Sequence, residues 1–114
     1  MQIEVTGRNV DITEALRHHI TGKVEHDLHD FPETEFVHVV LELQRHRQMA
    51  EVVVQAGHHV RVEADAESDD MYASIDLAVE RAAKQMRKHR DRVQEHHHES
   101  LAEVEREIQD AETS

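Results

Sequence analysis

The sequence predicts an α+β fold: a two-layer sandwich, in the order β-α-β-β-β-α, with two helices on one face of a four-stranded sheet. Three observations support this class. Four stretches alternate apolar and polar residues, two carry apolar residues at helical spacing, and short turns separate the last three strands. Alternating strands present one apolar face, and two amphipathic helices are available to cover it.

The first strand and the first helix occupy the N-terminal part of the chain. QIEVT (residues 2–6) alternates in the manner of a strand. The following segment, DITEALRHHITGKVEHDL, has an apolar residue at every fourth position, which is typical of a helix with one buried stripe. The stripe consists of Ile12, Leu16, Ile20, Val24 and Leu28. We expect Asp11 to cap this helix with Glu14 as its capping-box partner, and Phe31-Pro32 to end the segment.

Three further alternating stretches predict an antiparallel meander: EFVHVVLELQ (35–44), MAEVVVQA (49–56) and HVRVEADA (59–66). A polar turn, RHRQ (45–48), and Gly57-His58 connect them. The side chains expected on the buried face are Val37, Val39, Leu41, Leu43, Ala50, Val52, Val54, Ala56, Val60, Val62, Ala64 and Ala66. The opposite face of the sheet is expected to be polar.

A second helix is expected to begin at Ser68-Asp69-Asp70, where carboxylates suit the positive end of a helix, and to run to about Gln94. Its buried stripe is Met71, Ile75, Ala78, Val79, Ala82, Met86 and Val93. These elements place the folded domain at residues 1–95. Residues 96–114 carry six acids and one Arg, so we expect a flexible or weakly helical acidic tail, because so short a helix is marginal alone.

Positive charge is concentrated in the second helix. The chain of 114 residues has 25 acids, 13 bases and a net charge of −12, yet residues 81–92 hold six bases and one acid. Arg81, Lys84, Lys88 and Arg92 are spaced to share one exposed flank, with Arg87 and Arg90 further round. Solvated charge that compensates the negative helix end is one explanation. In so acidic a chain, a phosphate-bearing partner is the other.

Double-stranded-RNA-binding domains have a similar sandwich and bind a polyanion. They contact phosphates and 2′-hydroxyls and recognise the shape of the RNA, not its base sequence. A platform for stacking bases is not expected, because the aromatic residues Phe31, Phe36 and Tyr72 form no stacking pair on a strand.

Three stretches resemble a known family: MQIEVTGRNVDITEALRHHI, VHVVLELQRHRQMAEVVVQ and EADAESDDMYASIDLAVERAAKQMRKHRDR. They resemble short ribosome hibernation promoting factors, including the ribosome-associated inhibitor A branch. The resemblance covers about residues 1–95, and its most specific piece is DDMYASID followed by the basic helix.

The resemblance implies a cytoplasmic, non-enzymatic factor of stress and stationary phase. Such a factor binds 16S rRNA in the decoding channel of the small ribosomal subunit, blocks mRNA and tRNA binding and inhibits translation. The implied rRNA contacts are Lys23, Arg81, Lys84, Arg87, Lys88 and Arg92, with Arg45 and Arg47 as additions. The first helix departs from the family pattern, because Lys23 is followed by His26 and His29 rather than by further bases. A separate ribosome modulation factor is a further implied partner, and the chain is expected to be monomeric off the ribosome.

Other functions find less support in the residues. A protein-interaction module would use the acidic tail or the polar sheet face, which includes His38, Glu42, His59, Arg61 and Glu63. No cofactor or functional metal site is expected, because the chain lacks cysteine, a Gly-rich phosphate loop and an H-E-x-x-H motif among its twelve histidines. A G-x-S-x-G setting for a catalytic serine is also absent. No signal peptide, membrane span or DNA partner is expected, so the default location is the cytoplasm.

Overall fold

The computed structural model describes residues 1–95, and its elements follow the expected order. They are β1 (Gln2–Arg8), α1 (Glu14–Leu28), β2 (Thr34–Gln44), β3 (Arg47–Ala56), β4 (Val60–Ser68) and α2 (Met71–Glu95). The chain divides into two compact units, Met1–Ala83 and Lys84–Ser114. The first unit holds the sheet, α1 and the first part of α2, and the described part of the second is the remainder of α2. The predicted acidic tail lies outside the described residues.

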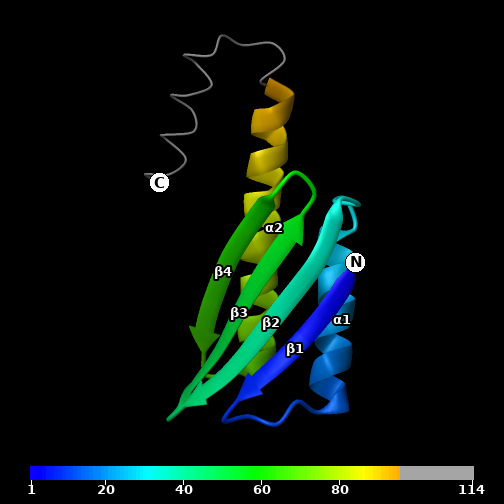
Figure 1. Cartoon of the computed structure of the whole chain (residues 1–114). Coiled ribbons are helices and arrows are strands. Elements are labelled where there is room, and N and C mark those ends of the chain that lie inside the picture. Colours follow the sequence, from blue (N-terminus) through cyan, green and yellow to red (C-terminus); the bar gives the residue numbers. More distant parts are fainter. Residues whose placement is uncertain (96–114) are drawn as a thin grey trace. The chain divides into compact units, whose positions relative to one another are not determined.

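The sheet has the strand order β1-β2-β3-β4. β1 pairs with β2 in parallel, with Ile3 opposite Val37, and α1 is the crossover that a parallel pair requires. β2, β3 and β4 form the predicted antiparallel meander. In Figure 1, α1 and residues 71–83 of α2 lie behind the sheet, on one of its faces. The predicted fold class is confirmed.

The core of the first unit lies between this sheet face and the two helices. The predicted stripe of α1 is buried from Leu16 onward, and the stripe of α2 is buried at Ile75, Ala78, Val79 and Ala82. Alternate residues of the central strands meet these helices from the sheet, namely Val37, Val39, Leu41, Ala50, Val52 and Val54, all at most 1% exposed. Burial of this apolar surface is the main force that stabilises the sandwich.

The prediction for Leu43 was wrong, because this side chain is 36% exposed. The pairing of β1 with β2 ends at Arg8 and Glu42, so Leu43 lies beyond the part of β2 that has strands on both sides. Strand alternation assigns a side chain to a face of the sheet, but it does not show how far along the strand that face is covered.

The N-cap of α1 also differs from the prediction. The helix begins at Glu14, and the cap is Thr13, whose Oγ1 accepts a hydrogen bond from the amide of Leu16 at 3.1 Å. Thr13 thus satisfies one of the free amides of the first turn, which was the role expected of Asp11. Ile12 lies before the helix, close to Gly7.

Two glycines are expected to respond oppositely to alanine. A Cβ at Gly22, inside α1, would meet nothing within 4 Å, so Gly22→Ala should raise the free energy of unfolding by about 0.5–1 kcal/mol. A Cβ at Gly7 would lie 2.3 Å from the carbonyl oxygen of Val10, so Gly7→Ala should lower it. Urea denaturation of both variants measures the changes. A stabilising Gly7→Ala would contradict the close approach of these two backbone segments.

Candidate nucleic-acid interface

The C-terminal part of α2 presents several cations without carboxylate partners. Lys84, Arg87 and Lys88 are exposed, and Arg92 is half-exposed in the last turn. Lys84, Lys88 and Arg92 follow one another at intervals of four residues, so they lie along one helix face. Within residues 1–95, no hydrogen bond or ion pair holds the head group of any of these four residues. They are therefore available to a partner with negative charge.

Arg81 belongs to the first unit and is held in place at the β4 edge. Its Nη1 donates a hydrogen bond to the backbone carbonyl of Asp65 at 2.7 Å, and the residue is exposed. A carbonyl acceptor orients the guanidinium but does not cancel its charge. Arg81 is thus both fixed and positive, and the remaining guanidinium donors can reach an outside acceptor.

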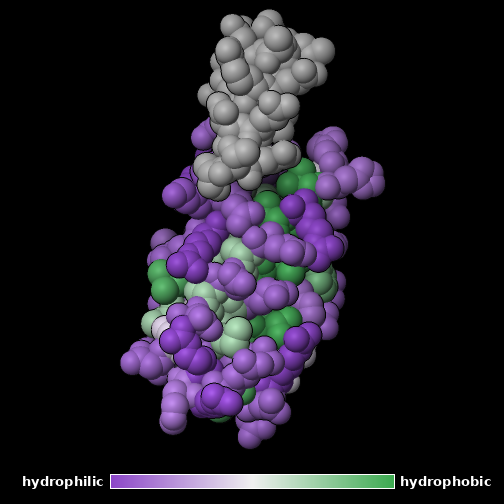
Figure 2. Space-filling model, turned by 90° about the vertical axis from the view of Figure 1, so that its left-hand side faces the viewer, coloured by the Kyte–Doolittle hydropathy of each residue, from purple (hydrophilic) through white to green (hydrophobic). Residues whose placement is uncertain are grey.

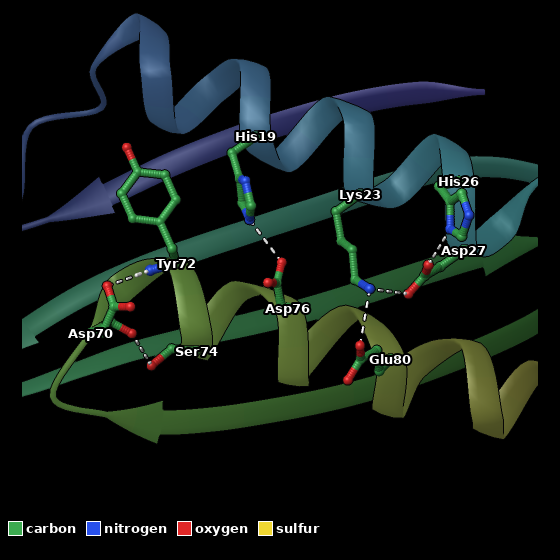
Figure 3. Close-up of polar contacts among 9 residues, drawn as sticks. All are labelled: His19, Lys23, His26, Asp27, Asp70, Tyr72, Ser74, Asp76 and Glu80. Atoms are coloured by element: carbon green, nitrogen blue, oxygen red, sulfur yellow. Dashed lines mark hydrogen bonds and ion pairs between the residues drawn. The ribbon is translucent and has the colours of Figure 1, made fainter.

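Lys23, in contrast, belongs to a row of polar contacts between α1 and α2. Its Nζ lies 3.0 Å from Glu80 and 3.2 Å from Asp27, and Figure 3 shows it between the two carboxylates. Next along α1, Nε2 of His19 lies 2.7 Å from a carboxylate oxygen of Asp76. We call these the interhelical polar row. Because two carboxylates offset its charge, Lys23 is less available to phosphate than the cations of α2.

The pKa of Lys23 reflects this environment. Partial burial lowers the pKa of its ammonium, but hydrogen bonds to Glu80 and Asp27 and their negative charges outweigh burial, so the pKa lies above the ordinary value of 10.5. A group whose pKa is raised on folding adds stability below its unfolded pKa, and this stability is lost as the pH rises through the folded pKa.

Lys23→Met should therefore lower the free energy of unfolding by about 1 kcal/mol or less at pH 7. The difference from the unmodified chain should shrink as the pH rises above 10.5. Thermal unfolding of both chains from pH 7 to pH 11 measures this difference. A gap that stays constant across the range would mean that Lys23 acts through packing of its stem and not through its charge.

The two arginines of the β2–β3 turn differ in their partners. Nη2 of Arg47 lies 2.6 Å from Glu67, and this hydrogen bond and the nearby charge raise the pKa of Arg47 above its usual range. Arg45 is exposed, has a positive φ of 56°, and has no hydrogen bond or ion pair within residues 1–95. Of the two, Arg45 presents the less compensated charge.

The acidic start of α2 has a structural role, as the sequence suggested. Oδ1 of Asp70 accepts a hydrogen bond from the amide of Tyr72 at 3.2 Å. The buried hydroxyl of Ser74 donates to the carbonyl of Gln48 and lies 2.6 Å from Oγ of Ser68. These contacts join the helix start to β3 and β4.

The described residues lack two other kinds of feature. In the part of the chain from residue 1 to residue 95, no group of three or more His, Cys, Asp or Glu side chains could hold a metal ion. Neither α1 nor α2 is long and apolar enough to cross a membrane. On the side shown in Figure 2, where β4 forms the sheet edge, hydrophilic side chains dominate and apolar surface is confined to patches among them.

The sandwich and its cationic helix define a small α+β domain suited to binding rather than to catalysis. The family model described as "Sigma 54 modulation protein / S30EA ribosomal protein" matches residues 3–94, and the chain belongs to this family. Among its relatives is the ribosome hibernation promoting factor of Escherichia coli K12, 39% identical over 98 residues that make up 84% of this chain and all of the relative. The factor of the same name from Azotobacter vinelandii is 30% identical over 92 residues, 81% of this chain and 85% of the relative.

Two solved structures are similar in fold. The ribosomal subunit interface protein from Coxiella burnetii superposes with a TM-score of 0.75 at 28% identity, over 80% of this chain and 99% of that one. The N-terminal domain of Thermus thermophilus Protein Y gives a TM-score of 0.68 at 33% identity, over 75% of this chain and 94% of that one. The family resemblance noted in the sequence is confirmed. Members of this family bind ribosomes and are not enzymes.

Proposed function

We propose that this chain is a ribosome hibernation factor that binds 16S rRNA of the small subunit in the decoding channel. There it would block mRNA and tRNA binding and inhibit translation during stress or stationary phase, in the cytoplasm. Family membership and the names of the relatives support the ribosome as the partner. The rRNA contact is inferred from three cations on α2 that are exposed and unpaired within residues 1–95, namely Lys84, Arg87 and Lys88.

The charge distribution explains how such a factor would orient itself. The chain as a whole carries −12, so most of its surface is repelled by RNA. The cations of α2 are attracted to phosphates, and each neutralised phosphate releases condensed counterions. Attraction at one helix and repulsion elsewhere favour a single docking orientation. Contact with phosphates and 2′-hydroxyls of A-form rRNA requires no reading of base edges.

The eight proposed contacts therefore differ in their expected contributions. The largest contributions are expected from Lys84, Arg87, Lys88 and Arg92, and further contributions from Arg81 and Arg45. Lys23 and Arg47 are expected to contribute less, because Glu80, Asp27 and Glu67 already offset their charges. A separate ribosome modulation factor remains a proposed further partner.

Co-sedimentation with isolated ribosomal subunits tests the proposal. We expect the full chain to pellet with small subunits and not with large subunits, and to be released as salt increases. Pre-bound mRNA and initiator tRNA should reduce its binding, and the chain should inhibit translation in a cell-free extract. Binding to small subunits that mRNA and tRNA leave unchanged would place the contact outside the decoding channel and overturn that part of the proposal.

A further inference from the structure

The face of the sheet that α1 and residues 71–83 of α2 do not cover is not uniformly polar. In Figure 1 this open face is turned toward the viewer. The sequence predicted polar side chains here, but the two central strands place four half-buried apolar side chains on it, and that expectation was wrong for them. They are Phe36 and Val40 of β2 and Met49 and Val53 of β3.

Several carboxylates lie beside this apolar strip, and one of them, Glu63, is paired with Arg61. Along β4, the side chains of Glu63, Asp65 and Glu67 point to the open face, and Glu51 of β3 pairs directly with Asp65. Neither Glu51 nor Asp65 has a hydrogen bond or ion pair from its side chain within residues 1–95. Two like charges directly opposite on adjacent strands lower stability. A pair of this kind, without a direct ion-pair partner, is a site where a further positive group would be stabilising.

A hollow of about 420 Å³ lies at this pair. Val40 and Met49 provide apolar lining. The charged lining consists of four acids and two arginines: Glu42, Glu51, Asp65, Glu67, Arg8 and Arg81. Glu67 is already paired with Arg47, which leaves the three acids Glu42, Glu51 and Asp65 against the two arginines. Negative charge remains in excess around an apolar floor, which suits a side chain with an aliphatic stem and a cationic head.

The charges of this face argue against other occupants. The acids would repel RNA, and a second copy of the chain would bring the same acidic face to its partner. Within residues 1–95, no cluster offers enough ligands for a metal ion. A lysine- or arginine-rich protein segment meets none of these objections, because its stems can lie on Val40 and Met49 while its heads approach Glu51 and Asp65.

We propose that the open face of the sheet, centred on Met49, Glu51 and Asp65, docks an extended basic segment of a partner protein. This surface includes none of the cations Lys84, Arg87 and Lys88 that carry the proposed rRNA contact, although Arg81 lines the hollow. The chain would thus use two surfaces of opposite charge, one for RNA and one for a basic protein.

Fluorescence anisotropy tests this inference with a fluorescein-labelled peptide in which lysine alternates with serine. The full chain should bind it, and a copy with glutamine in place of lysine should not bind. Glu51→Gln/Asp65→Asn should weaken binding by about tenfold. The matched variant Glu25→Gln/Glu33→Gln changes the net charge equally at exposed acids outside the open face. It should weaken binding by less than about twofold.

Met49→Ser tests the contribution of the apolar lining independently, because it leaves the net charge unchanged. It should weaken binding by about threefold. Glu51→Gln/Asp65→Asn removes a like-charge pair, so its melting temperature should not fall and loss of folding would not explain weaker binding. Equal weakening by the two double variants would show attraction by net charge alone and overturn the inference. Loss of peptide binding through self-association of the chain would overturn it as well.

Discussion

Lys84→Gln/Lys88→Gln is expected to weaken binding to small ribosomal subunits by about 15- to 30-fold at 0.15 M salt. This loss corresponds to one phosphate neutralised by each lysine. Each lost phosphate contact lowers the slope of log affinity against log salt by about 0.7 to 0.9, so the two together lower it by about 1.4 to 1.8. Both side chains are exposed and unpaired within residues 1–95, so their removal leaves no buried partner unsatisfied.

The measurement is co-sedimentation over a series of salt concentrations, so that slope and affinity are obtained together. Arg8→Gln/Arg17→Gln serves as the matched control, because both arginines are exposed and unpaired in the described part of the chain but lie outside α2. We expect this control to keep the slope of the unmodified chain. If both variants lowered the slope of log affinity against log salt equally, binding to the subunit would depend on net charge rather than on the cations of α2.

Leu41→Ala is expected to lower the free energy of unfolding by about 2–5 kcal/mol. Leu41 is fully buried on β2, so the shorter side chain loses apolar contacts and leaves a cavity. For a domain whose total stability is about 5–15 kcal/mol, this loss is a large fraction. Urea denaturation measures it, provided that the slope with denaturant stays unchanged.

Leu43→Ala is the matched control for this prediction. The two leucines lie on the same strand and, by alternation, on the same face, but Leu43 is 36% exposed. Its replacement should cost about 1 kcal/mol or less. Similar costs at Leu41 and Leu43 would show that the helix layer covers the end of β2 more fully than the structure indicates.

The order of elements could be predicted because local patterns carry it. Alternation at Val37, Val39 and Leu41, and fourfold spacing from Leu16 to Leu28, each reflect one buried face. The prediction for Leu43 was wrong because it depended on where a neighbouring strand ends. The cap assigned to Asp11 was wrong because Thr13 offers the same kind of acceptor at the residue where the helix begins.

The candidate interface could be predicted only in part. The cations of α2 are visible in the sequence because six of them lie close together. The pairing of Lys23 with Glu80 joins residues 57 positions apart, and no local pattern reveals it. The apolar strip of the open face had a signal in the sequence, since VVL and VVV interrupt strict alternation at Val40 and Val53. That signal shows that both faces carry apolar residues, but not which acids lie beside them.

The parallel pairing of β1 with β2 has a consequence for the order of folding. β1 is synthesised before β2, yet Ile3 pairs with Val37, 34 residues later. At a synthesis rate of about 5–20 residues per second, the partner residues in β2 emerge at least about 2–7 s after those of β1. The hairpins of β2, β3 and β4 close between nearer residues and at lower entropic cost. Strand β1 should therefore dock last, and in refolding followed by pulsed hydrogen exchange its amides should become protected later than those of β3.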